Sequence, residues 1–323
     1  NSIILRTFDH NFIYIFALSS FSYSASILIQ SIFLLRFTNI YLALIGSLVI
    51  FSLHPYAIYP WHTYYLFFLI NIFLILRFSK KEVSKYSSYF ILSIIILFSE
   101  SFLLASILIL IFDLLLIPFI FKQKFKFNLK ELLIKLLIFI TPILFFLFYL
   151  LNNDIFDYWR EYNKMWNVFF EILNVNIFEI LILFISHLKN YSISRIFSEP
   201  NWFIYSIIII TNSVYLILFI IKKFKKKISN EKNYLAIISF CSIVLLYQTL
   251  HSISIFKFSC GLILGLIIIF KLIHQLKNFE YKLVLTTILL LYSISAFEFS
   301  KNHSNHLYVY KFKKEEHISN DYF

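Results

Sequence analysis

The chain contains little glycine, cysteine or charge. Its 323 residues include 3 glycines, 5 prolines and 2 cysteines, and 14% of them are charged. No glycine-rich phosphate loop, His-Glu-x-x-His zinc pair or Gly-x-Ser-x-Gly elbow occurs. Cys241 and Cys260 lie in apolar segments, with neither disulfide nor metal-binding spacing. These absences leave carboxylate, cation and aromatic chemistry as the means by which this chain could act.

Apolar residues dominate the composition. They make up 60% of the chain, and the mean hydropathy is +0.80, whereas a soluble domain is about half apolar and a quarter charged. Lipid offers the backbone no water, so spanning segments must be helices or closed barrels, and runs of about 20 apolar residues fit helices. The sequence therefore predicts an all-α polytopic membrane protein with nine to ten transmembrane helices.

Apolar runs recur along the chain, and no soluble domain or internal repeat stands out. We predict a single transmembrane domain over residues 1–323 and expect it to be a fragment, because Asn1 is neither a methionine nor part of a signal peptide. The runs lie at 12–34, 39–54, 62–77, 88–121, 132–151, 202–221, 234–250, 255–273 and 283–298, with a weaker one at 168–187.

Short cationic loops set the predicted orientation. The strongest lie at 77–85, 122–130 and 222–227. Short loops rich in lysine and arginine stay in the cytoplasm, so we place these three loops inside. The net charge of +12 is then explained by orientation in the membrane, and we expect membrane lipid and no nucleic acid as a partner.

The run 88–121 is expected to form a hairpin, since it joins two loops that are both predicted to be cytoplasmic. As one helix it would be roughly 50 Å long, against a hydrocarbon core of about 30 Å. Its strongly polar point is Ser99-Glu100-Ser101, so we expect the turn there, with Glu100 at the outer surface. Asp113 then lies deeper on the returning arm and could pair with a neighbouring helix.

The same alternation of sides places residues 152–201 outside the membrane. One helix leaves the cytoplasm at 132–151 and another returns at 202–221, so the weaker run 168–187 cannot also cross. We expect an extracytoplasmic loop with an interfacial helix at 152–201 and an extracytoplasmic tail at 299–323.

Ionisable side chains gather on the predicted outer face. At membrane depth such a group costs about 2.5–3.5 kcal/mol, so each needs a partner or a function. We take three carboxylates as candidate catalytic groups and six cations or histidines as candidate substrate-binding groups: Glu100, Asp9 and Asp157, and then His54, His62, Arg160, Lys164, His251 and Lys257.

Each candidate also has a purely structural alternative. Glu100 could cap the hairpin turn at the water interface. Asp157 and Arg160 could pair at i, i+3 on the solvated face of a surface helix. The histidines could be interface residues, and Lys257 could extend to the lipid headgroups. The residue types alone leave these alternatives open.

Several short sequence segments, most of which contain a polar residue or a proline, follow one another in residues 5–125. They are Leu5-Arg6, Phe33 to Arg36, Tyr41 to Leu48, His54-Pro55, His62 to Tyr65, Arg77 and Phe98 to Phe102. This order resembles that of polytopic GT-C glycosyltransferases, which include protein mannosyltransferases and the aminoarabinose transferases of lipid A. In that superfamily an Arg-led helix pair precedes an outward loop that starts with Pro, and a Tyr-bearing helix then leads to a hairpin.

The resemblance implies transfer of a sugar from a polyprenyl-phosphate donor to a lipid, glycan or protein acceptor, on the outer face of the bacterial inner membrane. The superfamily's catalytic carboxylates lie in the first external loop, before the segment that begins here at about Leu5. Asp9 would be the last remnant of that loop, and Glu100 matches a second polar residue by position alone. A carboxylate would act as general base, cations would stabilise the phosphate charge, and a divalent metal ion could share that task.

Three other classes of protein stay open. An O-antigen polymerase or ligase would suit the large loop 152–201, but it would need an Arg/His-rich motif, and the loop offers Arg160, His187 and Arg195. A transporter or flippase would favour inverted repeats and helices broken by glycine or proline, which 3 glycines and no visible repeat support weakly. A structural membrane subunit would tolerate the outer polar residues without needing them.

Overall fold

The structure is a computed structural model that describes residues 12–53, 62–98, 102–116, 129–161, 200–223, 230–246 and 261–307. Within these ranges the regular elements are helices and none is a strand, which confirms the predicted all-α fold. The main elements are α2 (Phe12–Phe37), α3 (Ile40–Ser52), α4 (His62–Arg77), α5 (Glu82–Phe98), α6 (Leu103–Ile111), the π-helix η2 (Phe112–Leu116), α8 (Leu129–Asn152), α11 (Pro200–Lys223), α12 (Asn230–Val244), the 3-10 helix η4 (Ile263–Gly265), α14 (Leu266–Gln275) and α15 (Phe279–Leu307).

Four helical stretches are long and apolar enough to cross a membrane, judged by length and composition. They are Ala17–Phe37, Leu129–Asn152, Phe203–Ile221 and Phe279–Phe299. Shorter apolar helices cover Ile40–Ser52, Tyr64–Arg77, Leu103–Leu116 and Ile263–Gln275. The described part of the chain is therefore a membrane-embedded helical bundle.

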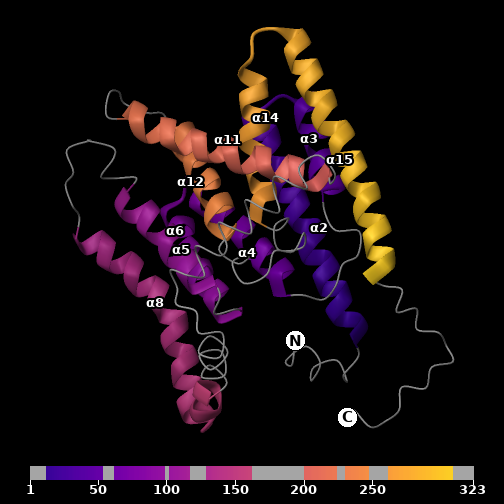
Figure 1. The fold of residues 1–323 in the computed structure, drawn as a ribbon. Coiled ribbons are helices and arrows are strands. Elements are labelled where there is room, and N and C mark those ends of the chain that lie inside the picture. Colours follow the sequence, from indigo (N-terminus) through magenta and orange to yellow (C-terminus); the bar gives the residue numbers. More distant parts are fainter. Residues whose placement is uncertain are drawn as a thin grey trace, which may run out of the picture.

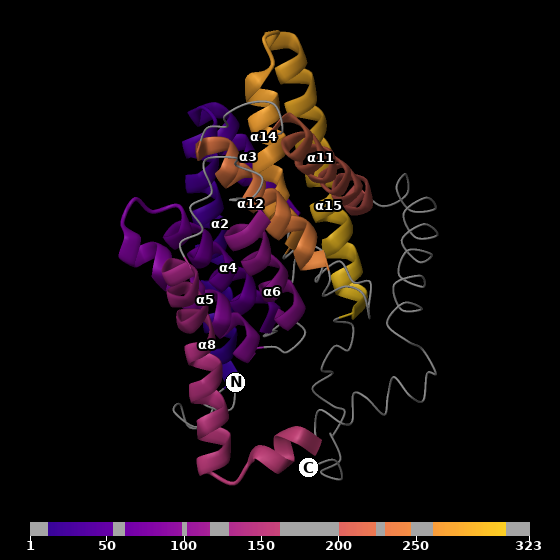
Figure 2. The same ribbon diagram turned by 90° about the vertical axis from the view of Figure 1, so that its left-hand side faces the viewer.

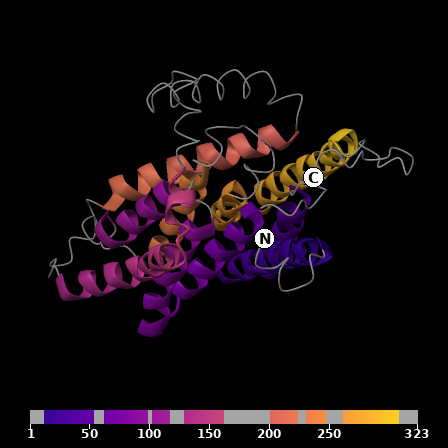
Figure 3. The same cartoon turned by 90° about the horizontal axis from the view of Figure 1, so that it is seen from below.

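The helices form two layers around a central helix. Seen from below, α2, α4, α5 and α8 follow one another in one layer, while α11 and α15 lie in the other (Figure 3). The short helix α14 lies between the layers and contacts α2 and α3 on one side and α11 and α12 on the other. In Figure 1, α11 runs obliquely across the bundle rather than along it.

The segment formed by η4 and the first half of α14 is apolar and enclosed on every side. Residues 262–270 are at most 6% exposed, as expected of a helix that is surrounded by other helices and not by water. Two glycines allow neighbours to approach it closely. A Cβ atom at Gly46 would lie 2.8 Å from Leu34 Cδ1 and 3.2 Å from Phe270, and one at Gly265 would collide with the amide of Asn212.

The helix α8 stands at the edge of the bundle and contacts mainly α5. Of its residues, Phe139, Pro142 and Leu150 are buried. Large apolar side chains cover its exposed surface, as expected for a face against lipid tails. Beyond α8 the chain turns through Asp154, which has a positive φ of 54°, and a short helix over 156–161 leaves the bundle at an angle (Figure 2).

The expected hairpin after the cationic loop 77–85 is present in its two arms. The outgoing arm α5 ends at Phe98, and α6 begins at Leu103 and packs against α5. The turn itself, with Glu100, lies outside the described residues. The returning arm changes at Phe112 from an α-helix to a π-helix, which contains Asp113.

Candidate functional site

Most of the predicted outer-face residues lie outside the part of the chain that the structure describes. His62 begins α4, but its side chain also falls outside the description. The catalytic and binding roles of these residues stay predictions. The other residues that lie outside are Asp9, His54, Glu100, Lys164, His251 and Lys257.

Asp157 and Arg160 are described, and they pair with each other on a surface helix. Asp157 Oδ1 lies 3.2 Å from Arg160 Nη2, and the two side chains are 75% and 55% exposed. This is the i, i+3 ion pair that the sequence allowed as the structural alternative. Trp159, on the same helix, packs edge-on against Phe146 of α8 with ring centroids 6.3 Å apart, so this ring contact links the short helix to the last turns of α8.

The described residues that flank two of the predicted outer segments are bonded to each other. The hydroxyl of Tyr205, in the first turns of α11, donates a hydrogen bond to the carbonyl oxygen of Leu53 at 3.2 Å. Both residues are fully buried. Leu53 is the last described residue before His54, and α11 follows directly on the segment that contains Lys164. The described residues that flank these two segments therefore meet in the half of the bundle away from Arg36.

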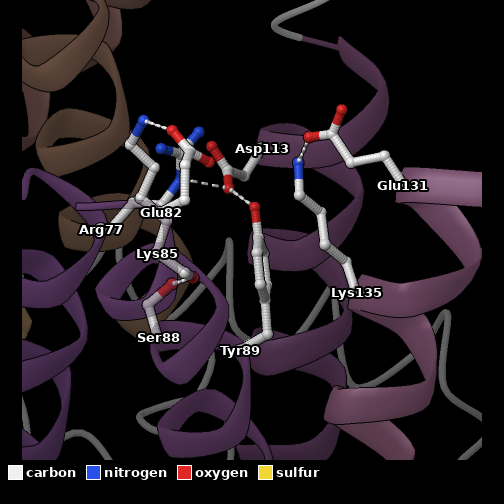
Figure 4. Close-up of polar contacts among 8 residues, drawn as sticks. All are labelled: Arg77, Glu82, Lys85, Ser88, Tyr89, Asp113, Glu131 and Lys135. Atoms are coloured by element: carbon white, nitrogen blue, oxygen red, sulfur yellow. Dashed lines mark hydrogen bonds and ion pairs between the residues drawn. The ribbon is translucent and has the colours of Figure 1, made fainter. Parts of the chain in front are cut away.

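The best-defined polar site of the described chain lies at the opposite end. Arg77 Nε donates to Asp113 Oδ2 at 2.6 Å, and the hydroxyl of Tyr89 donates to the same oxygen at 2.7 Å (Figure 4). Arg77 ends α4, Tyr89 belongs to α5 and Asp113 to η2. We call these three residues the Asp113 network. It joins three helices at one carboxylate oxygen.

The Asp113 network follows from one acidic residue in an apolar segment. Asp113 is the only ionisable residue of Leu103–Leu116, and its side chain is 1% exposed. An unpaired carboxylate at this depth would be costly, and Arg77 supplies the opposite charge. The π-helix widens the backbone at this position, a feature that is frequent at functional sites. The second oxygen, Oδ1, is buried and has no hydrogen-bond partner among the described residues.

More exposed ion pairs surround the Asp113 network. Lys85 Nζ and Glu82 Oε1 lie 2.5 Å apart at i, i+3, and Lys135 Nζ and Glu131 Oε1 lie 2.5 Å apart at i, i+4 (Figure 4). Lys135 Nζ also lies 5.8 Å from the centre of the Tyr89 ring. The hydrogen bond from Lys85 lowers the pKa of Glu82, which lies before the apolar part of α5. These pairs form a charged rim around the buried one.

A second group of contacts joins α2, α12 and α14 at the same end. Lys271 Nζ lies 2.5 Å from Glu231 Oε1 and donates to the carbonyl oxygen of Phe37 at 3.1 Å. The Arg36 guanidinium lies 5.2 Å from the centre of the Tyr234 ring. The ends of α2, α4, η2 and α14 thus meet the beginnings of α5, α8 and α12, as the predicted alternation of directions requires.

Sequence reasoning identified Asp113 as a residue that could pair but did not identify its partners. The available signal was a lone carboxylate in an apolar run. Arg77 lies in a predicted cytoplasmic loop. Tyr89 is one of 22 tyrosines, and no sequence signal separates it from the others. Only the packing of α5 against both α4 and α6 brings the three side chains together.

Within the described ranges, no three His, Cys, Asp or Glu side chains come close enough to hold a metal ion. The predicted divalent metal therefore stays a prediction. No family model, curated protein or solved structure matches the chain. Any function must therefore be argued from the residues and their arrangement.

Proposed function

We propose that this protein is a membrane-embedded glycosyltransferase. It transfers a sugar from a polyprenyl-phosphate donor to a lipid, glycan or protein acceptor on the outer face of the bacterial inner membrane. The proposal includes nine to ten transmembrane helices, with the cationic ends of the bundle inside. The observation that carries it is the hydrogen bond between Tyr205 and Leu53, because these residues flank two segments whose sequences contain candidate binding residues, His54 and Lys164.

The order and packing of the first helices also support the proposal. An antiparallel pair, α2 and α3, precedes α4 and then the α5–α6 hairpin, which agrees with the order in the superfamily that the sequence resembles. The Asp113 network ties this hairpin to α4 at its base. A hairpin that is held at its base would keep Glu100, at its tip, in a constant position, as a general base requires.

The proposed reaction needs a base and a group that stabilises phosphate. An oxygen or nitrogen of the acceptor attacks the anomeric carbon of the donor, and the bond from this carbon to the phosphate oxygen breaks. Glu100 or Asp9 accepts the acceptor's proton, and polyprenyl phosphate leaves with the electron pair. Arg160, Lys164 or Lys257 would stabilise the phosphate charge. The histidines would bind sugar hydroxyls.

The test is a transfer assay in membranes that contain the protein expressed from its complete coding sequence. Labelled polyprenyl-phosphate hexoses and pentoses are supplied, and label in lipid, glycan and protein is counted. We expect transfer from at least one donor, and a loss of about 10²-fold or more in Glu100→Gln or Asp9→Asn. The exposed inner-end variant Lys81→Gln is the matched control and should keep full activity. Absence of transfer from every donor, or full activity in both carboxylate variants, would contradict the proposal.

A transporter of lipid-linked sugars is the second candidate, because one helix is interrupted within the bundle. The 3-10 segment Ile263–Gly265 precedes α14, and two of its neighbouring carbonyls accept side-chain hydrogen bonds at 3.2 Å, Gly265 from Asn212 and Leu262 from Ser242. Interrupted helices with such carbonyls are typical of transporter sites. Movement of labelled donor across vesicles without transfer to an acceptor would favour this function over the enzyme.

A further inference from the structure

The interface between α2 and α4 contains a stripe of uncharged polar side chains. On α2 these residues recur at helical spacing and are at most 5% exposed: Ser19, Ser22, Tyr23, Ser26 and Gln30. On α4, Tyr64 and Asn71 are also buried. Neither helix contains Asp, Glu, Lys or Arg before Arg36 in α2 or Arg77 in α4. The stripe is therefore polar and uncharged through most of the membrane.

The two helices run parallel, and two contacts define how they are aligned. At one end the hydroxyls of Ser19 and Tyr65 lie 2.9 Å apart. Toward the other end the rings of Phe33 and Phe78 lie 5.7 Å apart. Ser19 and Tyr65 are 46 positions apart in the sequence, and Phe33 and Phe78 are separated by nearly the same number. The two helices therefore keep the same alignment between these contacts. Asn71 is therefore level with about Ser26.

Gln30 and Asn71 lie in this interface about one helical turn apart. Tyr23 and Tyr64 contact each other across it, with ring centroids 6.0 Å apart. Gln30 follows Tyr23 by seven residues and Asn71 follows Tyr64 by seven, which is about two helical turns and returns each side chain to the same face. The two amides thus face the same interface within about one turn of each other.

Both amides have atoms that the described protein leaves unpaired. Each residue is fully buried. Gln30 Oε1, Gln30 Nε2 and Asn71 Oδ1 have no hydrogen-bond partner among the described residues, while Asn71 Nδ2 donates to the carbonyl of Phe67 at 2.8 Å. Buried polar groups in proteins are nearly always satisfied, so such atoms need an explanation. Together they require a partner with two donors and one acceptor.

We infer that Gln30 and Asn71 form a membrane-embedded binding site for the uncharged, hydroxyl-bearing ring of a sugar. Neighbouring sugar hydroxyls both donate and accept, so one ring can satisfy all three atoms. The absence of charged side chains in the stripe excludes the phosphate of a lipid-linked sugar from this level. The identity of the ligand as a sugar rests on the proposed function.

A sugar would reach this site from the end where Ser19 and Tyr65 meet. Both amides are enclosed in the present arrangement, so the halves of α2 and α4 that contain Ser19 and Tyr65 must separate first. No Asp, Glu, Lys or Arg lies in those halves, and a neutral hydrogen bond between hydroxyls is weaker than one to a charged group. Leu53 and Tyr205 meet in the same half of the bundle, to which the proposed function assigns the reaction.

The test is thermal unfolding of the purified protein in lipid nanodiscs. The probes are polyprenyl-phosphate glucose, mannose and galactose, with bare polyprenyl phosphate as the comparison. Gln30→Leu and Asn71→Leu remove the amides, Gln30→Met removes one without branching, and Leu28→Met is the control, because Leu28 lies on the same helix and is 63% exposed. Without probe, the leucine variants should be at least as stable as the wild type, since unpaired amides are removed.

With a sugar-bearing probe, the Tm of the wild type should rise more than with the bare lipid. Gln30→Leu and Asn71→Leu should lose this extra rise and bind the sugar probe at least about tenfold more weakly, since each variant removes at least one hydrogen bond to the sugar. Leu28→Met should keep it.

Three outcomes overturn the inference. The first is an extra rise that both leucine variants keep, and the second is a wild type with no extra rise for any of the three sugars. The third is a lower Tm without probe in both Gln30→Leu and Gln30→Met, which would mean that the amide is already satisfied, for example by bound water. The transfer assay on the same wild-type preparation judges the proposed function separately. If sugar transfer is observed together with any of these outcomes, the inferred sugar site is wrong, while the proposed transferase function stands.

Discussion

The molecule contains two aspartate–arginine pairs in opposite surroundings. Arg77 and Asp113 lie 2.6 Å apart with side chains 19% and 1% exposed, whereas Asp157 and Arg160 lie 3.2 Å apart with side chains 75% and 55% exposed. The first pair joins residues 36 positions apart, and the second joins neighbours on one helical turn. The same two chemical groups thus connect separate helices in the buried pair and lie on the surface of one helix in the exposed pair.

The two pairs differ in their exposure to water and in the number of groups that contact the carboxylate. Water and salt screen the exposed pair, so it stabilises the fold little. The buried carboxylate has lost its water and depends on Arg77 and on the Tyr89 hydroxyl. Such a pair gives little net stability compared with apolar residues, but the removal of one partner leaves a buried charge. The buried pair therefore specifies which helices pack together.

The largest effect should come from breaking the buried pair on one side. Arg77→Met leaves Asp113 charged and unpaired, so we expect a loss of about 3–5 kcal/mol in the free energy of unfolding. The double variant Arg77→Met with Asp113→Leu removes both charges and should recover most of that loss. Denaturant unfolding in detergent micelles measures both. Losses that simply add in the double variant would contradict the coupling.

A smaller effect should follow from Tyr89→Phe, which removes one hydrogen bond to a charged acceptor and keeps the ring. We expect a loss of about 1.5–3 kcal/mol in the same unfolding experiment. The half-buried Tyr86 on the same helix offers the matched control, and Tyr86→Phe should change stability by less than about 0.5 kcal/mol. If the two variants were equally stable, the Tyr89 hydroxyl would have no place in the network.

The smallest effect should come from the exposed pair. Asp157→Asn is expected to change stability by about 0.2–1 kcal/mol at low salt and by less at high salt. The same variant also sharpens the functional assignment, since a catalytic Asp157 would lose at least about 10²-fold in the transfer assay. Normal transfer would leave Asp157 as a surface residue, while a stability loss above 2 kcal/mol would show that its surroundings are not those of a solvated helix.

The hairpin shows how much of this fold was predictable. The length of the run 88–121 against the thickness of a bilayer predicted a turn near Glu100, and α5 does end at Phe98 before α6 begins at Leu103. The cationic loops likewise predicted that Arg77, Lys85 and Lys130 would share one end. Hydropathy could not predict which helices are central, and α14 was one apolar run among many until packing enclosed it.

The candidate sites also divide into contacts that the sequence could predict and contacts that it could not. The exposed pair at Asp157 and Arg160 was predictable because its spacing lies within one helix. The partner of Asp113 was not, because it depends on the rotation of α4 about its axis. In the sequence, Gln30 and Asn71 are isolated polar residues in apolar segments. Only the packing of α2 against α4 brings them into one interface.

By itself, the sequence determined that this protein is membrane-embedded, its helical class, the alternation of its helices and the two arms of its hairpin. These follow from local quantities: hydropathy, run length and the charge of short loops. Tertiary structure alone decided that Arg77 and Tyr89 meet Asp113, that Tyr205 is bonded to Leu53, and that two amides face one interface. The reason is physical, since lipid surrounds every helix with the same apolar medium, so hydropathy cannot select one partner helix over another. Shape and a few polar contacts make that choice.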